Sequence, residues 1–262
     1  MSQQNWFTGH MHLTTDESSL VFSIMRDLSG DFDHQEVRHR VGQRLLELLN
    51  ADYFASYLWD DDRQQFVSCV QINMSSDNLR RYEDYYQFHD PITPTLQRRK
   101  TATPVSAIMD HNRLEKTEFY NDFLKKDGLC YGINYFAYDR GDNIGDVRIW
   151  RSANNEDFST RDAHIVDAIG PSFVNALVRA HKFDKTIKAI RFVQIADDLC
   201  LTKREAEIAD LLVVGMTDGE ICQSLSISKP TLRSHVGSIF RKTGLNRRTQ
   251  LAQLLAGKNH HL

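Results

Sequence analysis

The stretch of sequence that decides the fold is residues 228–244, SKPTLRSHVGSIFRKTG. The stretch predicts a single helix, because Leu232, Val236 and Ile239 recur at helical spacing and form one apolar stripe. Ser228 before the stripe is a favourable N-cap, and Gly244 after it is typical of the residue that ends a helix. The sequence therefore predicts an amphipathic helix whose apolar stripe faces a core.

The opposite face of this helix is small and polar at its centre and cationic at its edges. It carries Ser234, Gly237 and Arg241, with Arg233 and Lys242 on the flanks. Short side chains allow close approach to DNA, and arginine and lysine reach guanine edges and phosphates. We interpret the stretch as a helix that lies in the major groove of DNA. A solvated basic face on any small bundle gives the same pattern.

The flanking segments favour the DNA-binding interpretation. Residues 202–205 (TKRE) and 217–220 (TDGE) are two capping boxes, fifteen residues apart, and each opens an apolar-periodic run. A leucine-bearing final helix follows residues 228–244. Four short helices with a tight turn between the second and third predict a helix-turn-helix domain over residues 200–262.

The charge distribution agrees with this prediction. The chain has 32 Lys and Arg against 35 Asp and Glu, yet residues 228–258 hold seven basic side chains and no acidic one. A basic edge on an otherwise acidic chain is the local footprint of a nucleic-acid binder. At 262 residues, the chain has room for a second domain with its own core.

Cysteine and histidine usage points away from disulfides, metals and cofactors. The four cysteines form no CxxC pair, which favours reduced thiols in a cytoplasmic protein; they are Cys69, Cys130, Cys200 and Cys222. Residues 1–19 read as a polar arm without the pattern of a signal peptide, and no apolar run approaches a membrane span. His10 and His12 lack the further ligands that a metal site needs. We expect no metal and no cofactor.

The part of the chain before residue 183 predicts an α+β sandwich with one central, mainly antiparallel sheet. Strands are expected at 52–60, 65–73, 129–139 and 146–151, and helices at 20–28, 36–50, 78–88, 116–127 and 158–182. In the second strand, alternation places Phe66, Val70 and Ile72 on one face. Residues 1–182 are expected to be a sensor domain, and residues 183–199 a linker.

Aromatic side chains suggest a ligand pocket in this sensor domain. Alternation in the first strand places Tyr53 and Tyr57 on one face, and the helix 78–88 contributes further tyrosines before a proline-rich loop. A small, largely apolar molecule would lie among these rings, with one carboxyl fixing a polar group. The candidate residues are Tyr53, Tyr57, Tyr82, Tyr86, Asp90 and Val105. Taken singly, each aromatic fits plain core packing better than ligand contact, and turn chemistry also favours aspartate before proline.

The helix 158–182 is a candidate dimer and signalling element. Its apolar residues recur at a spacing similar to that of coiled coils: Ile165, Ile169, Phe173 and Leu177. Packing within the domain predicts the same stripe, so both interpretations stay open.

The segment 201–255 resembles the LuxR-type DNA-binding domain. The residues that carry the resemblance are Leu201-Thr202, Arg204-Glu205, Gly215, Glu220-Ile221, Leu225, Ile227-Ser228, Thr231, His235, Ile239, Lys242, Leu245, Asn246-Arg247 and Leu251. The resemblance covers about the last quarter of the chain and is highly specific. It implies double-stranded promoter DNA, RNA polymerase and a second copy of the chain as partners, with two domains paired through the final helix on a two-fold site.

The resemblance also implies roles for single residues. Base contacts are implied for Arg233, Ser234 and Gly237. Phosphate contacts are implied around Thr217, Lys229, Thr231 and Arg241, and the flanking Lys242 completes the predicted DNA-binding set. Gly219 stands where the family usually has a basic residue and removes one phosphate contact. Gly237 contributes no side chain, so base reading is expected to depend most on Arg233.

Upstream, the chain resembles the autoinducer-binding LuxR regulators and GAF-like sensors, with a PAS/GAF-like fold implied. The shared residues are Asp90-Pro91 and Gly128-Leu129. In the autoinducer regulators this aspartate accepts a hydrogen bond from the amide of an acyl-homoserine lactone. The later tryptophan of that family is absent, because no tryptophan lies between Trp59 and Trp150. The resemblance therefore predicts a small-molecule pocket without specifying a lactone.

Three functional hypotheses follow. The first is a ligand-responsive transcriptional regulator. The second is a constitutive DNA-binding regulator whose N-terminal domain is a protein-interaction module. The third, an enzyme, lacks sequence support, because the chain contains no G-x-S-x-G, H-E-x-x-H, P-loop or G-x-G-x-x-G motif.

Overall fold

The structure, a computed structural model, describes residues 12–255, and only the backbone of residues 184–193 and 195. His10, most of the expected polar arm and the last seven residues of the chain lie outside the described residues. The chain divides into two compact units, residues 1–181 and residues 182–262, here called the N-terminal and C-terminal units.

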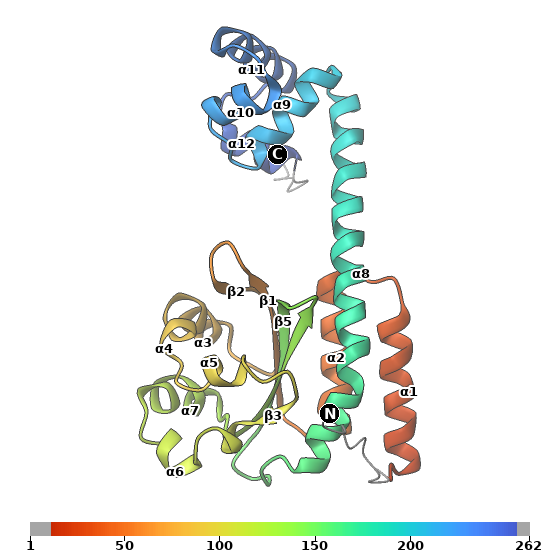
Figure 1. The fold of residues 1–262 in the computed structure, drawn as a ribbon, viewed down its shortest axis with the longest axis vertical. Helices are drawn as coiled ribbons and strands as arrows, with labels where there is room; N and C mark the ends of the chain where they lie inside the picture. Colours follow the sequence, from red (N-terminus) through yellow and green to blue (C-terminus); the bar gives the residue numbers. More distant parts are fainter. Residues whose placement is uncertain (1–11, 256–262) are drawn as a thin grey trace, which may run out of the picture. The chain divides into compact units, whose positions relative to one another are not determined.

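The N-terminal unit is built on a five-stranded sheet in the order β2-β1-β5-β4-β3 (Figure 1). The strands are β1 (Tyr53–Asp60), β2 (Gln65–Ile72), β3 (Thr103–Pro104), β4 (Tyr131–Asp139) and β5 (Asp142–Arg151). Every neighbouring pair is antiparallel. The predicted fold class, an antiparallel sheet with helices followed by a helical domain, is confirmed.

Three longer helices lie on one side of the sheet, with α1 packed against α2: α1 (Thr15–Ser29), α2 (His34–Leu48) and the first part of α8 (Thr160–Asp198) (Figure 1). The capping box of Thr14 and Glu17 starts α1 within the expected arm, so the helix begins five residues earlier than predicted. The first core of the unit lies between these helices and the sheet and includes Ile24, Val41 and Phe54.

The apolar stripe of α8 belongs to that same core. Its residues are between 1% and 3% exposed: Ile165, Ile169, Phe173 and Leu177. They pack within their own unit, which favours the packing interpretation over a dimer stripe. Although α8 has 39 residues, neither it nor any other helix within residues 12–255 combines the length and apolarity that a membrane crossing requires.

Short helical segments cover the opposite face of the sheet. They are α3 (Ser76–Arg81), α4 (Gln87–His89), α5 (Thr93–Leu96), α6 (His111–Leu114) and α7 (Lys125–Asp127). Two π-helical turns, Tyr82–Tyr86 and Tyr120–Leu124, join them. A second core, rich in aromatic side chains, lies between this layer and the sheet. The sheet is therefore buried on both faces.

One predicted strand face is wrong. Val70 and Ile72 join the first core as a pair, but Phe66 packs in the second core on the other side of the sheet. The cause is a β-bulge: Ser68 has φ 56°, and the register with β1 shifts between Ser56 and Leu58. An extra residue reverses the side-chain alternation beyond it.

The C-terminal unit contains the predicted helices as α9 (Lys203–Val213), α10 (Asp218–Leu225), α11 (Lys229–Thr243) and α12 (Arg248–Leu255). Both capping boxes form: the hydroxyls of Thr202 and Thr217 accept the first-turn amides, and the glutamates three residues on return the bond. Gly244, at φ 70°, ends α11. The core holds Ile208, Ile221 and Leu232 among others.

Candidate nucleic-acid interface and ligand cavity

The turn between α10 and α11 is set by local chemistry. Ser226 ends α10 in the left-handed conformation, and the Ser228 hydroxyl then accepts the amide of Thr231 at 3.3 Å. Leu232 and Ile239 on the inner face of α11 are 1% and 0% exposed. The outer face of α11 is thereby fixed toward solvent.

The structure places the predicted DNA-binding residues of α11 on that outer face. All seven of them are exposed: Lys229, Thr231, Arg233, Ser234, Gly237, Arg241 and Lys242. A Cβ built on Gly237 meets no atom within 4 Å, so the centre of the face is open. Thr217 is also exposed, and its hydroxyl lies 2.7 Å from Glu220 Oε2 inside the second capping box.

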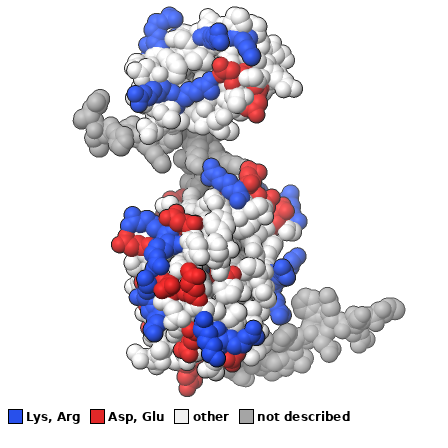
Figure 2. Space-filling model, turned by 90° about the vertical axis from the view of Figure 1, so that its left-hand side faces the viewer, with Lys and Arg blue, Asp and Glu red and all other residues white. Residues whose placement is uncertain are grey.

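The arginines and lysines of this unit fall into two groups. Lys229, Arg233 and Arg241 form no ion pair within the described part of the chain. Arg204 and Arg248, in contrast, pair with Glu207 and Asp218. Figure 2 shows lysines and arginines over the visible face of the C-terminal unit, with acidic side chains gathered at one side. The first group keeps its charge available for a phosphate backbone.

Lys242 differs from the other predicted DNA-binding residues. Its Nζ lies 2.7 Å from Glu205 Oε2 and donates to the Cys200 carbonyl at 2.8 Å. Although burial raises the pKa of Glu205, hydrogen bonds with Lys242, Ser238 and Thr202 lower it to about 2. Lys242 therefore has a structural partner, and its contact with DNA stays a prediction.

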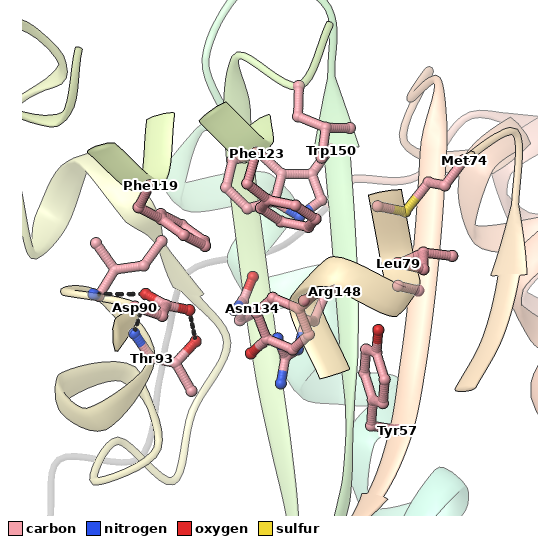
Figure 3. A pocket seen from close by; sticks show the side chains of 14 residues that line it. Tyr57, Met74, Leu79, Asp90, Thr93, Phe119, Phe123, Asn134, Arg148 and Trp150 are labelled. Atoms are coloured by element: carbon pink, nitrogen blue, oxygen red, sulfur yellow. Dashed lines mark hydrogen bonds between the residues drawn. The ribbon is translucent and has the colours of Figure 1, made fainter. Parts of the chain in front are cut away.

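The candidate ligand cavity lies between the sheet and the layer of short helices (Figure 3). Its volume of about 20 Å³ has room for roughly one water molecule. The lining residues are Ala55, Tyr57, Met74, Leu79, Tyr82, Asp90, Ile92, Thr93, Phe119, Phe123, Leu129, Asn134, Arg148 and Trp150. The cavity exists at the predicted place, but the protein's own side chains nearly fill it.

Three of the six predicted ligand residues line this cavity, namely Tyr57, Tyr82 and Asp90. The other three do not. Tyr86 packs behind the wall, with its ring centroid 6.0 Å from that of Phe119. Val105 lines a separate small cleft, and Tyr53 is half-buried beside the second core. For these three, the packing interpretation fits the structure better.

Asp90 is held by its own loop. Its Oδ1 accepts the amides of Ile92 at 2.8 Å and Thr93 at 3.0 Å, and its Oδ2 accepts the Thr93 hydroxyl. Burial raises the pKa of this carboxyl, although these hydrogen bonds counteract the rise. The structure thus gives Asp90 the turn-forming role that its position before proline also predicts.

Arg148, which the sequence analysis did not select, is the main charged group of the cavity. Its Nε donates to Asp146 Oδ2 at 2.8 Å, and its Nη1 donates to the Tyr82 hydroxyl. The guanidinium lies 4.5 Å from the ring centroid of Phe66 and 4.9 Å from those of Tyr57 and Tyr82. Such stacking stabilises a buried cation.

The ion pair with Asp146 keeps Arg148 charged. Burial lowers the pKa of Arg148, but Asp146 and the neighbouring tyrosines more than compensate, so its pKa is raised. Asp146 is held in turn by the amide of Tyr57, which donates to its Oδ1 at 2.8 Å. A paired, stacked arginine is thus positioned on the floor of the cavity.

Comparison with known proteins decides the family. A family model described as bacterial regulatory proteins, luxR family, matches residues 199–255. The spore germination protein GerE of Bacillus subtilis is 44% identical over 50 residues, which cover 19% of this chain and 68% of that protein. The chain belongs to the LuxR family of bacterial regulatory proteins. This LuxR-family chain carries the family's helix-turn-helix at α10 and α11.

Two solved structures resemble the N-terminal unit of this LuxR-family chain in fold. One is the N-acylhomoserine lactone dependent LuxR-family factor CepR2 from Burkholderia cenocepacia, at 15% identity and TM-score 0.50, covering 64% of this chain and 99% of that one. The other is the GAF domain of a phosphoenolpyruvate-protein phosphotransferase from Coxiella burnetii, at 12% identity and TM-score 0.51, covering 66% and 98%. The predicted PAS/GAF-like fold of the N-terminal unit is therefore confirmed.

Proposed function

We propose that this LuxR-family transcriptional regulator binds a two-fold DNA site as a homodimer and that a small molecule in the N-terminal cavity controls this binding. In this proposal residues 1–182 sense the ligand, 183–199 link, and 200–262 bind DNA. The observation that carries it is the outer face of α11, where Lys229, Arg233 and Arg241 are exposed without ionic partners in the described chain.

The proposed DNA contacts divide by reach and position. Arg233 and Ser234 lie beside Gly237, the open centre of α11, and would contact base edges in the major groove. Lys229 and Arg241, near opposite ends of the helix, would contact phosphates, as would the hydroxyls of Thr217 and Thr231. Two copies would pair through α12, and DNA-bound copies would contact RNA polymerase.

The ligand part of the proposal depends on movement of the cavity wall. A cavity of about 20 Å³ is far smaller than the roughly 300 Å³ of ordinary ligand pockets. The wall opposite the sheet consists of helices of three to six residues and two π-helical turns, which often occur at functional sites. This layer can shift at lower cost than the sheet, so a ligand would open the cavity by displacing it.

The proposal is tested with the purified full-length protein in two steps. Selection from a random duplex library should yield a motif with two-fold symmetry. Native mass spectrometry should then show a dimer, and part of the protein should exceed the mass of two denatured chains by the mass of a retained small molecule. A non-palindromic motif bound by a monomer would refute the two-fold site. Equal DNA affinity with and without the retained molecule would refute ligand control and favour a constitutive regulator.

A further inference from the structure

We propose that the N-terminal cavity binds a small aromatic carboxylate and that Arg148 holds its carboxylate group. This inference rests on the proposed function, because it names the chemical class of the ligand that would control DNA binding. It is carried by unused hydrogen-bonding groups around the cavity, by the charge already present there, and by the shape of the lining side chains.

Arg148 has more donors than partners. A guanidinium carries five N–H groups, and that of Arg148 makes two hydrogen bonds, through Nε to Asp146 and through Nη1 to Tyr82. Nη2 lies 2.7 Å from Asp146 Oδ2, but it makes no hydrogen bond of ordinary geometry within the described residues. Because Nε and Nη2 both approach the same carboxylate oxygen, the remaining N–H groups of the guanidinium stay available. The free end of the Arg148 guanidinium can therefore donate to a further acceptor, and a carboxylate is the acceptor that fits it best.

Two further polar atoms of the cavity lack strong partners. Asn134 Oδ1 is buried and makes no hydrogen bond among residues 12–255. The Tyr57 hydroxyl is also buried, and its partner within the described residues is the thiol of Cys69, which is a weak hydrogen-bonding group. Asn134 lies directly opposite Arg148 in the ladder of β4 and β5, and Figure 3 shows both side chains at the cavity.

These three groups define one polar end. A carboxylate beside Arg148 would accept from the guanidinium and from the Tyr57 hydroxyl. The amide of Asn134 can present its nitrogen to the ligand as well as its oxygen, because the two orientations have the same shape. One anionic head group would thus satisfy donors from β1, β4 and β5 at once.

The charge of the site selects against a cation. The three rings around this polar end, those of Tyr57, Phe66 and Tyr82, already stack on Arg148. Asp146 is neutralised by Arg148 and by the nearby Arg38, and Asp90 is satisfied by three donors of its own loop. Two cations, Arg148 and Arg38, thus act on the single carboxylate of Asp146, and this excess of positive charge beside the cavity attracts an anion.

The rest of the cavity fits a flat apolar body. Figure 3 shows Phe119, Phe123 and Trp150 on the side away from Tyr57. Aromatic side chains in the lining offer offset-stacked and edge-to-face contacts to a ligand ring, which an aliphatic body would not use. An aromatic ring therefore matches this end of the cavity once the wall of short helices has moved to admit it.

The inference is tested by titrating the full-length protein with benzoate, phenylacetate and 3-phenylpropionate, each beside its amide and the corresponding amine. Calorimetry and the melting temperature give the affinities. At least one acid should bind, at least tenfold more tightly than its amide, and no amine should bind. Binding of an amide as tight as that of its acid, or no binding of any acid, would overturn the inference.

Tyr57→Phe is the sharpest variant, because the hydroxyl that it removes has no stronger partner in the described structure than the Cys69 thiol. The free protein should therefore keep its melting temperature, while the affinity for the acid should fall about tenfold, as expected for a hydrogen bond to a charged group. Tyr85→Phe, at an exposed tyrosine outside the cavity lining, is the matched control and should leave the affinity unchanged. An unchanged affinity in Tyr57→Phe contradicts the proposed head-group site.

Arg148→Met alone would leave Asp146 buried without its cation, so the charge test uses the double variant Asp146→Asn/Arg148→Met. This protein should lose the tenfold preference for acid over amide, and retention of that preference would overturn the role of Arg148. The identity of the molecule retained in native mass spectrometry distinguishes a failure of this inference from a failure of the proposed function. A retained neutral molecule that alters DNA affinity would refute the carboxylate and leave ligand control intact.

Discussion

The exchange of Lys242 for methionine separates a structural lysine from a DNA-binding one. Lys242 Nζ lies 2.7 Å from the carboxylate of Glu205, whose side chain is 5% exposed, while the lysine side chain is 31% exposed. Methionine keeps the apolar stem and removes the charge. We therefore expect Lys242→Met to destabilise the C-terminal unit and to leave the salt dependence of DNA binding nearly unchanged.

The size of the effect follows from the pair. A hydrogen bond to a charged group contributes about 1.5–3 kcal/mol, and partial exposure of the lysine reduces this to roughly 1–2 kcal/mol. In a domain of this size, each kcal/mol shifts the melting temperature by about 4–8 °C. The matched control is Arg241→Met, at an exposed position without an ion pair in the described chain, which should change stability by less than about 0.5 kcal/mol.

Both effects can be measured on the full-length protein. The sequence has no tryptophan after Trp150, so a transition seen by circular dichroism but not by tryptophan fluorescence reports the C-terminal unit. DNA affinity is measured on a generic duplex over a series of salt concentrations. Arg241→Met should reduce the slope of log K against log salt by about 0.9, the value for one phosphate contact.

The opposite pattern would refute the reasoning. If Lys242→Met kept the stability of the C-terminal unit and reduced the salt slope as Arg241→Met does, the pair with Glu205 would not hold in solution. Lys242 would then contact DNA, as the sequence predicts, and the salt slope would identify that contact as one to a phosphate.

Three further predictions concern the C-terminal unit. Arg233→Ala should weaken specific binding by about 1–3 kcal/mol and relax one base position in a selection experiment, and an unchanged preference would contradict its base-reading role. Gly219→Lys should steepen the salt slope by about 0.9, because a Cβ there meets only Thr217 Oγ1 at 4.0 Å and the side chain can reach a phosphate. The pKa of Glu205 falls from 4.5 to about 2 on folding, so its contribution to stability is complete above pH 4.5 and is lost as the pH falls toward 2. When the pH is lowered, Glu205→Gln should not show that part of the loss of stability. A pH dependence of stability identical to that of the unsubstituted protein would contradict the pKa shift of Glu205.

The C-terminal unit was predictable because its signals are local. A capping box uses two residues three apart, and both boxes form as their sequences predict. The apolar stripe of α11 likewise needs only helical spacing. The partner of Lys242 was not predictable in this way, because Glu205 is 37 residues distant and the two meet only when α9 and α11 pack together.

The strand face of Phe66 shows a different limit. Strand alternation assumes an unbroken register, and a single left-handed residue, Ser68, reverses it. Serine at a bulge has no signature that separates it from serine in a regular strand. The error mattered for the site, because Phe66 is the ring nearest to Arg148 in the cage that holds it.

Arg148 was missed for a reason that concerns the whole sheet. In β5 the charged Asp146 and Arg148 alternate with Val147 and Ile149, a pattern that usually marks one buried and one solvated face. Here both faces are covered, so Asp146 and Arg148 are 0% and 6% exposed. Trp150 continues the charged face, and an aromatic residue at that position is the signal that the face is buried. Together with the apolar residues on both faces of β1, Trp150 would have predicted that Asp146 and Arg148 form an ion pair inside the domain. A buried arginine with unused donors in turn indicates a ligand.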